Sequence, residues 1–285
     1  MRRHPAGLPE RINLINRTLV IGVLNVTPDS FSDGGNQADT QSAVAHGLAL
    51  AKSGADIIDV GGESTRPGAE RVSITEELDR VIPVVQGLVS AGQVVSVDTM
   101  RAEVAAEAVA AGAMLINDVS AGKADPKMFS ILAEVQVPYI MMHWRGHSTE
   151  MMTQTNYKDL VAEVTTELMD QVNQAVAAGI SPSRIVLDPG IGFAKKPEHN
   201  WPLLAKINQF QELGYPVLVG ASRKRFIGEL LAVGGVPRDV DNREYATAAV
   251  TTLMAQQNIW AVRVHDAQAS ADAIAVVERL RSEDE

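Results

Sequence analysis

The chain has 285 residues, of which 46% are hydrophobic and 21% are charged, so a disordered or low-complexity protein is excluded. Its 35 acidic side chains outnumber its 25 basic ones and leave a net charge of −10, which argues against a nucleic acid or an anionic membrane surface as a partner. The sequence contains no cysteine, which excludes disulfides, thiolate metal sites and cysteine nucleophiles, and the cytoplasm is the expected compartment.

The N-terminal segment carries no clear structural pattern. We expect residues 1–18 to form a loose leader and residues 19–285 to form a single domain. The most apolar stretches, such as 19–26, have the length of a strand and fall short of the roughly 20 residues that a membrane helix needs. A signal peptide is not expected either, because residues 27–30 (TPDS), and not a small-residue cleavage site, follow the first apolar stretch.

Short apolar runs rich in β-branched residues alternate with polar loops and Ala-rich stretches along the chain. Such runs are typical of strands that are buried on both faces, as the strands of a parallel sheet are. The eight runs cover 19–26, 55–61, 94–98, 114–119, 137–143, 184–190, 215–222 and 260–265.

The stretches between the runs have the spacing of amphipathic helices. The longest apolar face includes Val161, Val164, Leu168 and Val172. An additional helix over about 243–257 falls between the last two runs. The alternation predicts a parallel sheet, and eight units predict an α/β fold with a single (β/α)8 TIM barrel and an extra helix between the last two strands. An open doubly wound sheet is the alternative.

Polar groups follow nearly every predicted strand. In a (β/α)8 barrel, chemistry takes place where the strands end, at the C-terminal face. Some of these side chains are hydrogen-bond acceptors and others are donors, most of them cationic. The predicted pocket therefore has one wall for a flat, donor-rich heterocycle and another for a phosphate-like anion. The groups are Asn25, Arg66, Asp98, Asn117, Asp118, His143, Asp188, Ser222, Lys224, Arg263 and His265.

Longer motifs lie at the same strand ends and follow one another in a fixed order. They are NVTPDSFSDGG (25–35), GESTRPG (62–68), SVDT (96–99), IND (116–118), DPGIGF (188–193), SRKR (222–225) and RVH (263–265). In this set and order the chain resembles the dihydropteroate synthase family, from about Leu19 to the C-terminus. The NVTPDSF and SRK segments are the most specific of them.

The resemblance implies a folate-pathway transferase on a TIM barrel. Such an enzyme transfers the pterin-methyl group of 6-hydroxymethyl-7,8-dihydropterin diphosphate to 4-aminobenzoate. The products are 7,8-dihydropteroate and diphosphate, and Mg²⁺ is required. The resemblance also implies a homodimer that is the target of sulfonamides.

The resemblance further implies roles for single residues. The pterin-binding positions are Asp98, Asn117, Asp188 and Lys224. The diphosphate-binding positions are Thr65, Arg66, Arg263 and His265. The aminobenzoate pocket has Pro67, Phe193 and the start of a helix at Arg225. Asn25 matches a metal ligand, and Phe31 and Asp33 belong to a first loop that is expected to act as a lid. The residues expected to be catalytic are Asp98, Lys224, Arg263 and His265.

The chemistry of this reaction sets what the protein has to supply. The reacting methylene is attached to an electron-rich dihydropterin, so it can lose diphosphate with carbocation character. We expect ionised Asp98 to stabilise the positive charge that spreads into the pterin. We expect Arg66, Arg263, His265 and Mg²⁺ at Asn25 to hold the departing diphosphate.

Two other functions stay open at this point. A methyltetrahydrofolate–corrinoid methyltransferase-like barrel would share the acceptor residues but has no need of the basic wall. A non-catalytic pterin-binding paralogue should have lost part of the first motif or of Arg263-x-His265, and both are intact.

Simpler roles are also available for some of these residues. His143 is interpreted as a structural group, and Glu63 as a possible structural partner of an arginine at the barrel mouth. Ser222, Asp188 and His265 could form a hydrolytic triad, but the sequence lacks the nucleophile-elbow motif.

Overall fold

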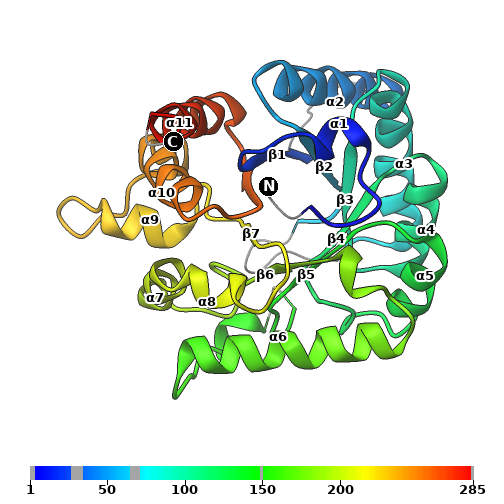
Figure 1. The fold of residues 1–285 in the computed structure, drawn as a ribbon. Helices are drawn as coiled ribbons and strands as arrows, with labels where there is room; N and C mark the ends of the chain where they lie inside the picture. The colour runs from blue at the N-terminus through cyan, green and yellow to red at the C-terminus, as the bar shows by residue number, and fades with distance from the viewer. Residues whose placement is uncertain (1–3, 27–34, 65–70, 148–149, 284–285) are drawn as a thin grey trace.

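The computed structural model describes residues 4–26, 35–64, 71–147 and 150–283, and shows eight parallel strands around a common axis (Figure 1). Adjacent strands pair in the order β6-β5-β4-β3-β2-β1-β8-β7. Leu187 forms a parallel bridge with Val217 and donates its N–H to the Pro216 carbonyl at 2.9 Å, which brings β6 against β7 and closes the ring. The predicted barrel is confirmed. The strands are β1 (Leu19–Asn25), β2 (Ile57–Gly61), β3 (Val95–Asp98), β4 (Leu115–Asp118), β5 (Tyr139–Met142), β6 (Ile185–Asp188), β7 (Leu218–Val219) and β8 (Ala261–Val264).

The helices surround the barrel, and several begin at a side chain that caps them. Ser73 accepts the Glu76 N–H at the start of α3, and Asp159 and Asp266 act in the same way at α6 and α11. The predicted extra helix is confirmed as α10, which α9 precedes. The helices are α2 (Gly35–Lys52), α3 (Ile74–Ser90), α4 (Ala102–Ala110), α5 (Met128–Val135), α6 (Leu160–Ala177), α7 (Asn200–Ala205), α8 (Ile207–Gln211), α9 (Arg225–Leu230), α10 (Glu244–Gln256) and α11 (Ala267–Arg281). Over the described ranges, none has the length and apolar character that crossing a membrane requires.

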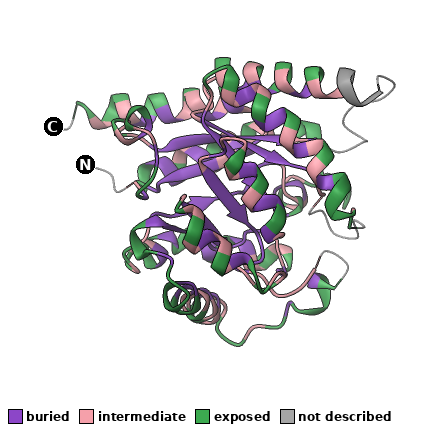
Figure 2. Cartoon of the chain, turned by 90° about the vertical axis from the view of Figure 1, so that its right-hand side faces the viewer, coloured by how far each residue is buried: buried purple, intermediate pink, exposed green. Residues whose placement is uncertain are grey.

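The strands are buried on both faces, as their apolar runs predicted (Figure 2). Alternate residues of each strand belong to two separate apolar clusters. Val20, Val97 and Val262 pack outward with the helices, whereas Ile21, Ile57 and Leu218 fill the lower part of the barrel interior. The inward-facing positions continue upward to the C-terminal face, so the period of two decides which polar residues enter the site.

The N-terminal segment differs from the loose leader expected from the sequence. The short helix α1 (Glu10–Asn13) lies across the N-terminal end of the barrel (Figure 1), with Leu8 and Ile12 buried in the lower interior cluster. Ala6 donates its N–H to the Ser183 carbonyl at 2.8 Å. Residues 4–18 are ordered because the barrel floor exposes apolar side chains, such as Trp260, that these residues cover.

Candidate active site

The upper end of the barrel interior carries a layer of polar residues that the strand register aligns. Asn25 of β1 pairs in register with Gly61 of β2, Gly61 with Asp98 of β3, and Asp98 with Asn117 of β4. All four have the inward parity of the strands. Gly61 has no side chain, and a Cβ there would lie 3.8 Å from Asn25 Oδ1 and 3.9 Å from Asp98 Oδ2. The missing side chain therefore leaves a gap the size of one methyl group between Asn25 and Asp98.

Arg263 connects the two sides of this layer. Its Nη2 donates to Asp98 Oδ2 at 2.8 Å, and its Nε donates to Asp59 Oδ2 at 2.6 Å. Asn117 Nδ2 donates to the same Asp59 oxygen at 3.0 Å. Asp98 and Arg263, which the sequence assigned to one face, are thus in direct contact. In this structure the guanidinium faces carboxylates, rather than forming a separate basic wall.

Asp59 is a site residue that the sequence reasoning missed. It is fully buried in the middle of β2, and a lone carboxylate inside the apolar run IIDVG was the signal that could have found it. Its neighbour in register on β3 is Ser96. Among the described residues, Asp59 Oδ1 and the Ser96 hydroxyl have no hydrogen-bond partner. Buried polar atoms of this kind are normally paired, so they mark a position for a ligand or water.

The protonation of Asp98 follows from its surroundings. Burial raises the pKa of Asp98 to about 7, the Arg263 charge opposes that rise, and the Asp59 carboxylate adds to it. A carboxyl group that changes charge near neutral pH is a common feature of active sites.

Asp188 and Lys224 form the other side of the site. Asp188 Oδ1 accepts the Gly190 N–H at 2.7 Å. A Cβ at Gly220 would lie 4.0 Å from Asp188 Oδ2 and 3.8 Å from Arg263 Cβ, so this glycine leaves a slot between the two side chains. Burial lowers the pKa of Lys224 to about 8, although Asp188 opposes that shift, and burial raises the pKa of Asp188 while Lys224 lowers it.

The candidate aminobenzoate wall lies beside Lys224. The Lys224 ammonium contacts the Ile191 carbonyl and lies 4.5 Å from the centre of the Phe193 ring. The structure therefore brings Phe193, expected at the aminobenzoate pocket, next to Lys224, expected at the pterin.

His265 lies at the rim, where Ser222 holds it. Its Nδ1 is 3.0 Å from the Ser222 hydroxyl, and the same hydroxyl accepts the His265 N–H at 3.2 Å. The serine at the end of the seventh strand therefore holds the histidine in position through its hydroxyl group. The Asp188 carboxylate contacts Gly190 instead, so the geometry gives no support to a hydrolytic triad.

The side chains of two polar residues from the strand ends and motifs make their contacts away from this polar layer. Arg225 begins α9, but its side chain is 79% exposed and pairs with Glu229 at 2.6 Å. Asp118 faces outward and accepts hydrogen bonds from Ser120, Gly122 and Tyr139. Five predicted site residues lie outside the described residues: Phe31, Asp33, Thr65, Arg66 and Pro67.

Glu63, at the start of the second motif, has the structural role that was one of its two interpretations. It pairs with Arg101 at 2.9 Å and with Arg71 at 3.2 Å. Arg101 also contacts Glu77, whose carboxylate accepts the Thr99 hydroxyl at 2.6 Å. This network connects the base of the second loop to the residue that follows Asp98.

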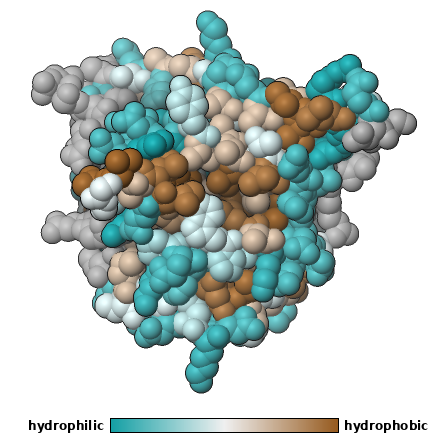
Figure 3. All heavy atoms as spheres, turned by 90° about the vertical axis from the view of Figure 1, so that its left-hand side faces the viewer, coloured by the Kyte–Doolittle hydropathy of each residue, from teal (hydrophilic) through white to brown (hydrophobic). Residues whose placement is uncertain are grey.

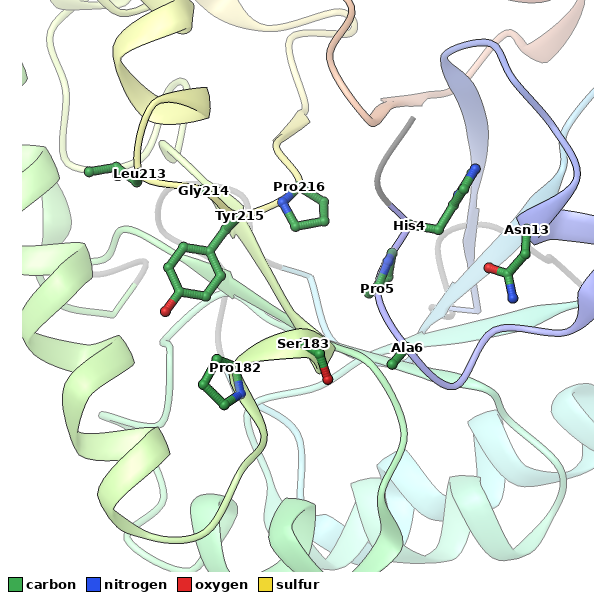
Figure 4. A pocket seen from close by; sticks show the side chains of 10 residues that line it. All are labelled: His4, Pro5, Ala6, Asn13, Pro182, Ser183, Leu213, Gly214, Tyr215 and Pro216. Atoms are coloured by element: carbon green, nitrogen blue, oxygen red, sulfur yellow. The ribbon is translucent and has the colours of Figure 1, made fainter. Parts of the chain in front are cut away.

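A hollow of about 680 Å³ lies at the opposite, N-terminal end of the barrel (Figure 4). Its lining includes His4, Ser183 and Tyr215 but none of the predicted site residues. His4 is occupied there, because its ring nitrogens contact the Ile15 carbonyl at 2.8 Å and the Trp260 N–H at 3.3 Å. The candidate active site is therefore the polar C-terminal end.

Comparison with known proteins connects this geometry to a family. The family model described as "Pterin binding enzyme" matches residues 21–265. Dihydropteroate synthase of Mycobacterium leprae is 53% identical over 260 residues, which cover 90% of this chain and 92% of the relative. Dihydropteroate synthase of Xanthomonas albilineans, solved with 4-aminobenzoic acid, is 45% identical with a TM-score of 0.87, over 94% of each chain. That of Yersinia pestis, solved as a sulfonamide drug complex, is 39% identical with a TM-score of 0.88, over 99% of this chain and 100% of the other.

Proposed function

The chain belongs to the pterin-binding enzymes and, among them, to the dihydropteroate synthases, and we propose that its C-terminal barrel face transfers a dihydropterin-methyl group from diphosphate to 4-aminobenzoate. The observation that carries this assignment is the contact of Arg263 with Asp98 and Asp59 at the end of the barrel that also holds Asn117, Asp188 and Lys224. Acceptors and cations meet there in one cluster, in which the acceptors are buried and the cations are half-buried.

The acceptors fit the flat face and edge of a pterin. Asp98, Asn117 and Asp188 project from three different strands, and the slot at Gly220 leaves space between Asp188 and Arg263. The N–H and amino groups of a pterin edge can donate to carboxylates, which form strong charge-assisted hydrogen bonds. Lys224 then supplies a donor for the acceptor atoms of the same ring.

The transfer needs no covalent enzyme intermediate. The methylene C–O bond breaks and its electron pair leaves with diphosphate. The amine lone pair of aminobenzoate forms the new C–N bond, and the nitrogen then releases one proton to water. In our proposal, ionised Asp98 stabilises the cation, and Arg263 and His265, with Thr65 and Arg66, hold the diphosphate. We propose that the aminobenzoate pocket consists of Phe193, Pro67 and the start of α9 at Arg225. Sulfonamides would occupy the same pocket. Phe31 and Asp33 belong to the loop that is expected to act as its lid.

The donor set at Asn25 fits Mg²⁺. Among the described residues no group of three His, Cys, Asp or Glu side chains could hold a metal. Mg²⁺ usually keeps several waters and takes few protein oxygens together with substrate phosphates. The Asn25 amide oxygen lies beside the methyl-sized gap at Gly61, at the C-terminal end of β1, and can supply one such contact. Bound Mg²⁺ would neutralise charge on the leaving diphosphate.

Asn25→Ala should therefore weaken the response to magnesium. We expect turnover to stop in EDTA and to return with Mg²⁺, and the variant should need about tenfold more Mg²⁺ for half-maximal rate, in the range seen for single metal-site contacts. Titration of Mg²⁺ at saturating substrates measures this, together with calorimetric binding of Mg²⁺–diphosphate. An unchanged Mg²⁺ requirement would remove Asn25 from the metal site.

The function itself is tested by turnover. The purified chain is mixed with 6-hydroxymethyl-7,8-dihydropterin diphosphate, 4-aminobenzoate and Mg²⁺, and diphosphate and dihydropteroate are measured. Equal release of both products, inhibited competitively by a sulfonamide against 4-aminobenzoate, supports the proposal. Pterin binding without release would instead indicate a non-catalytic paralogue, and methyl transfer to a corrinoid would indicate the other barrel type.

The pH profile should reflect Asp98 and Lys224. Because the folded pKa of Asp98 is raised to about 7, kcat/KM for the pterin substrate should fall about tenfold per unit as the pH drops below 7. Because the pKa of Lys224 is lowered to about 8, a second fall is expected above that pH. Rates measured from pH 5.5 to 9.5 check both limbs. An alkaline limb that persists in Lys224→Arg would contradict the assignment to Lys224.

We also propose that the enzyme is a homodimer through α10 and α11. Apolar side chains gather on the face at the left of Figure 1, which Figure 3 shows. Tyr245, Leu253, Val276 and Leu280 are 92%, 57%, 59% and 62% exposed. The face includes the Ala-rich residues 246–255 of α10. The lack of cysteine fits a cytoplasmic protein.

Leu280→Glu should therefore give monomers. Light scattering after size exclusion should show about twice the monomer mass for the wild type and half that value for the variant, since a buried charge opposes association. Leu14→Glu is the matched control, because Leu14 is 69% exposed at the C-terminus of α1. A monomeric wild type would overturn the dimer.

A further inference from the structure

The loop between β6 and α7 has a backbone that its surroundings have to hold in place. Gly190, Gly192 and Ala194 have positive φ angles of 69°, 79° and 47°. A Cβ at Gly190 would lie 2.4 Å from the His143 carbonyl oxygen, and one at Gly192 would lie 2.9 Å from Lys224 Cδ. Glycine adopts such angles freely, but Ala194 keeps a left-handed conformation only where neighbouring groups fix it, and the close packing leaves little space for a side chain at Gly190 or Gly192.

Two ammonium groups hold alternate carbonyls of this loop. Lys224 donates to the Ile191 carbonyl from the side of the active site. Lys195 donates to the Phe193 carbonyl at 3.0 Å from beneath the loop, where it is 3% exposed. Lys195 thus fixes the backbone of the residue whose ring faces the Lys224 ammonium.

Lys195 is itself anchored to two other elements. Its Nζ is 3.0 Å from Nδ1 of His143, which follows β5. Burial, with a further contribution from the Lys195 charge, lowers the pKa of His143 to about 3, so the ring is neutral and Nδ1 accepts. The opposite nitrogen, Nε2, then donates to Glu167 of α6 at 3.0 Å. A continuous chain of contacts therefore runs from Phe193 to α6.

The charge of Lys195 also acts on the pterin side. Burial lowers the pKa of Lys195 to about 7, while Asp188 raises it. The Lys195 charge in turn lowers the pKa of Asp188. This effect is smaller than those of Lys224 and of the Gly190 N–H, so the pterin side depends less on Lys195 than the Phe193 backbone does.

We propose that Lys195 is a positioning residue, which keeps Phe193 in place for aminobenzoate when Lys224 turns from the Ile191 carbonyl to the pterin. This inference rests on the proposed function, because it uses the roles of Lys224 and Phe193 there. The hydrogen-bond partners of Lys195 are the Phe193 carbonyl and His143, which are protein groups, so the proposal requires these contacts to persist when the substrates bind.

Lys195→Met tests the proposal, since methionine fills similar space without donors or charge. We expect KM for 4-aminobenzoate to rise about tenfold, while kcat and KM for the pterin substrate change less than about threefold, because a displaced wall weakens binding of one substrate. Lys195→Gln, which keeps a donor, should recover part of the aminobenzoate KM. Lys196→Met is the matched control, because the adjacent lysine is exposed.

Amide hydrogen exchange of residues 190–194 supplies a readout that needs no turnover. It should be faster in Lys195→Met and closer to the wild type in Lys195→Gln. An unchanged aminobenzoate KM with unchanged exchange would overturn the proposal, as would an equal fall of kcat and rise of both KM values. If the wild type makes no dihydropteroate, the proposed function fails, and exchange alone then decides whether Lys195 holds the loop. If the Met variant does not fold, Lys195→Gln carries the same test against the wild type.

Discussion

Asp98→Asn should lower kcat about a thousandfold at pH 8 while the protein stays folded. Two unit charges about 4 Å apart interact by about 4 kcal/mol at an effective dielectric of 20, which corresponds to roughly three powers of ten in rate. The asparagine oxygen can still accept from Arg263 Nη2, which lies 2.8 Å from the Asp98 carboxylate in the wild type. The substitution therefore removes the charge and keeps the contact.

The pH dependence separates this charge effect from a loss of geometry. Protonated Asp98 is neutral like asparagine, so the variant should lack the acid limb near pH 7 that the wild type shows. Steady-state rates across this range measure it. Asp56→Asn is the matched control, since Asp56 accepts two hydrogen bonds from Arg17 at the other end of β2. That variant should keep kcat within about twofold. A near-normal kcat in Asp98→Asn would remove the cation-stabilising role.

Much of this architecture could be predicted because parallel strands are buried on both faces and therefore consist of nearly continuous apolar runs. Eight apolar runs predict the barrel. Asp98 and Arg263 lie at its C-terminal end and face inward, because both occupy inward positions of the period of two. The same period, applied to every strand, also selects Asp59 and Ser96, which lie one inward position below the layer of Asp98. A rule based on strand ends does not select them, because the polar part of the interior extends two residues deeper along β2 and β3.

Other features depended on tertiary contacts that local patterns do not carry. The segment at Leu8 and Ile12 has no helical period, yet the uncovered barrel floor orders it. The sequence predicts a structural role for His143, but it cannot identify Lys195 as the partner, because the two residues are 52 positions apart. The pairing of Arg263 with two carboxylates also reverses the expected separation of acidic and basic walls. Which of several nearby groups an arginine pairs with depends on distances and burial in the folded protein, and the spacing of residues in the sequence does not reveal these.

That pairing gives Arg263→Ala two separable consequences. The first concerns stability, because removing one member of a buried ion pair leaves Asp59 and Asp98 without their cation, and we expect a loss of about 3 kcal/mol. Arg263 holds down the pKa of Asp98, so in the variant the folded pKa of Asp98 should lie above the wild-type value of about 7. A carboxyl group with a raised folded pKa makes the protein less stable as the pH rises through the interval between its unfolded and folded pKa values. The difference between variant and wild type should thus be smallest at pH 6 and widen above pH 7, as urea unfolding at pH 6 and pH 8.5 would measure.

The second consequence is the loss of diphosphate binding, which pH 6 isolates because the structural penalty is lowest there. Diphosphate with Mg²⁺ should raise the melting temperature of the wild type and leave that of Arg263→Ala unchanged, and kcat should fall a hundred- to a thousandfold, the usual cost of removing one donor to a developing anion. Arg17→Ala is the matched control, because it breaks an arginine–aspartate pair at the far end of the barrel. It should lose stability yet keep the full shift with diphosphate. Equal shifts in wild type and Arg263→Ala would mean that this arginine serves the carboxylates alone and that the anion binds elsewhere.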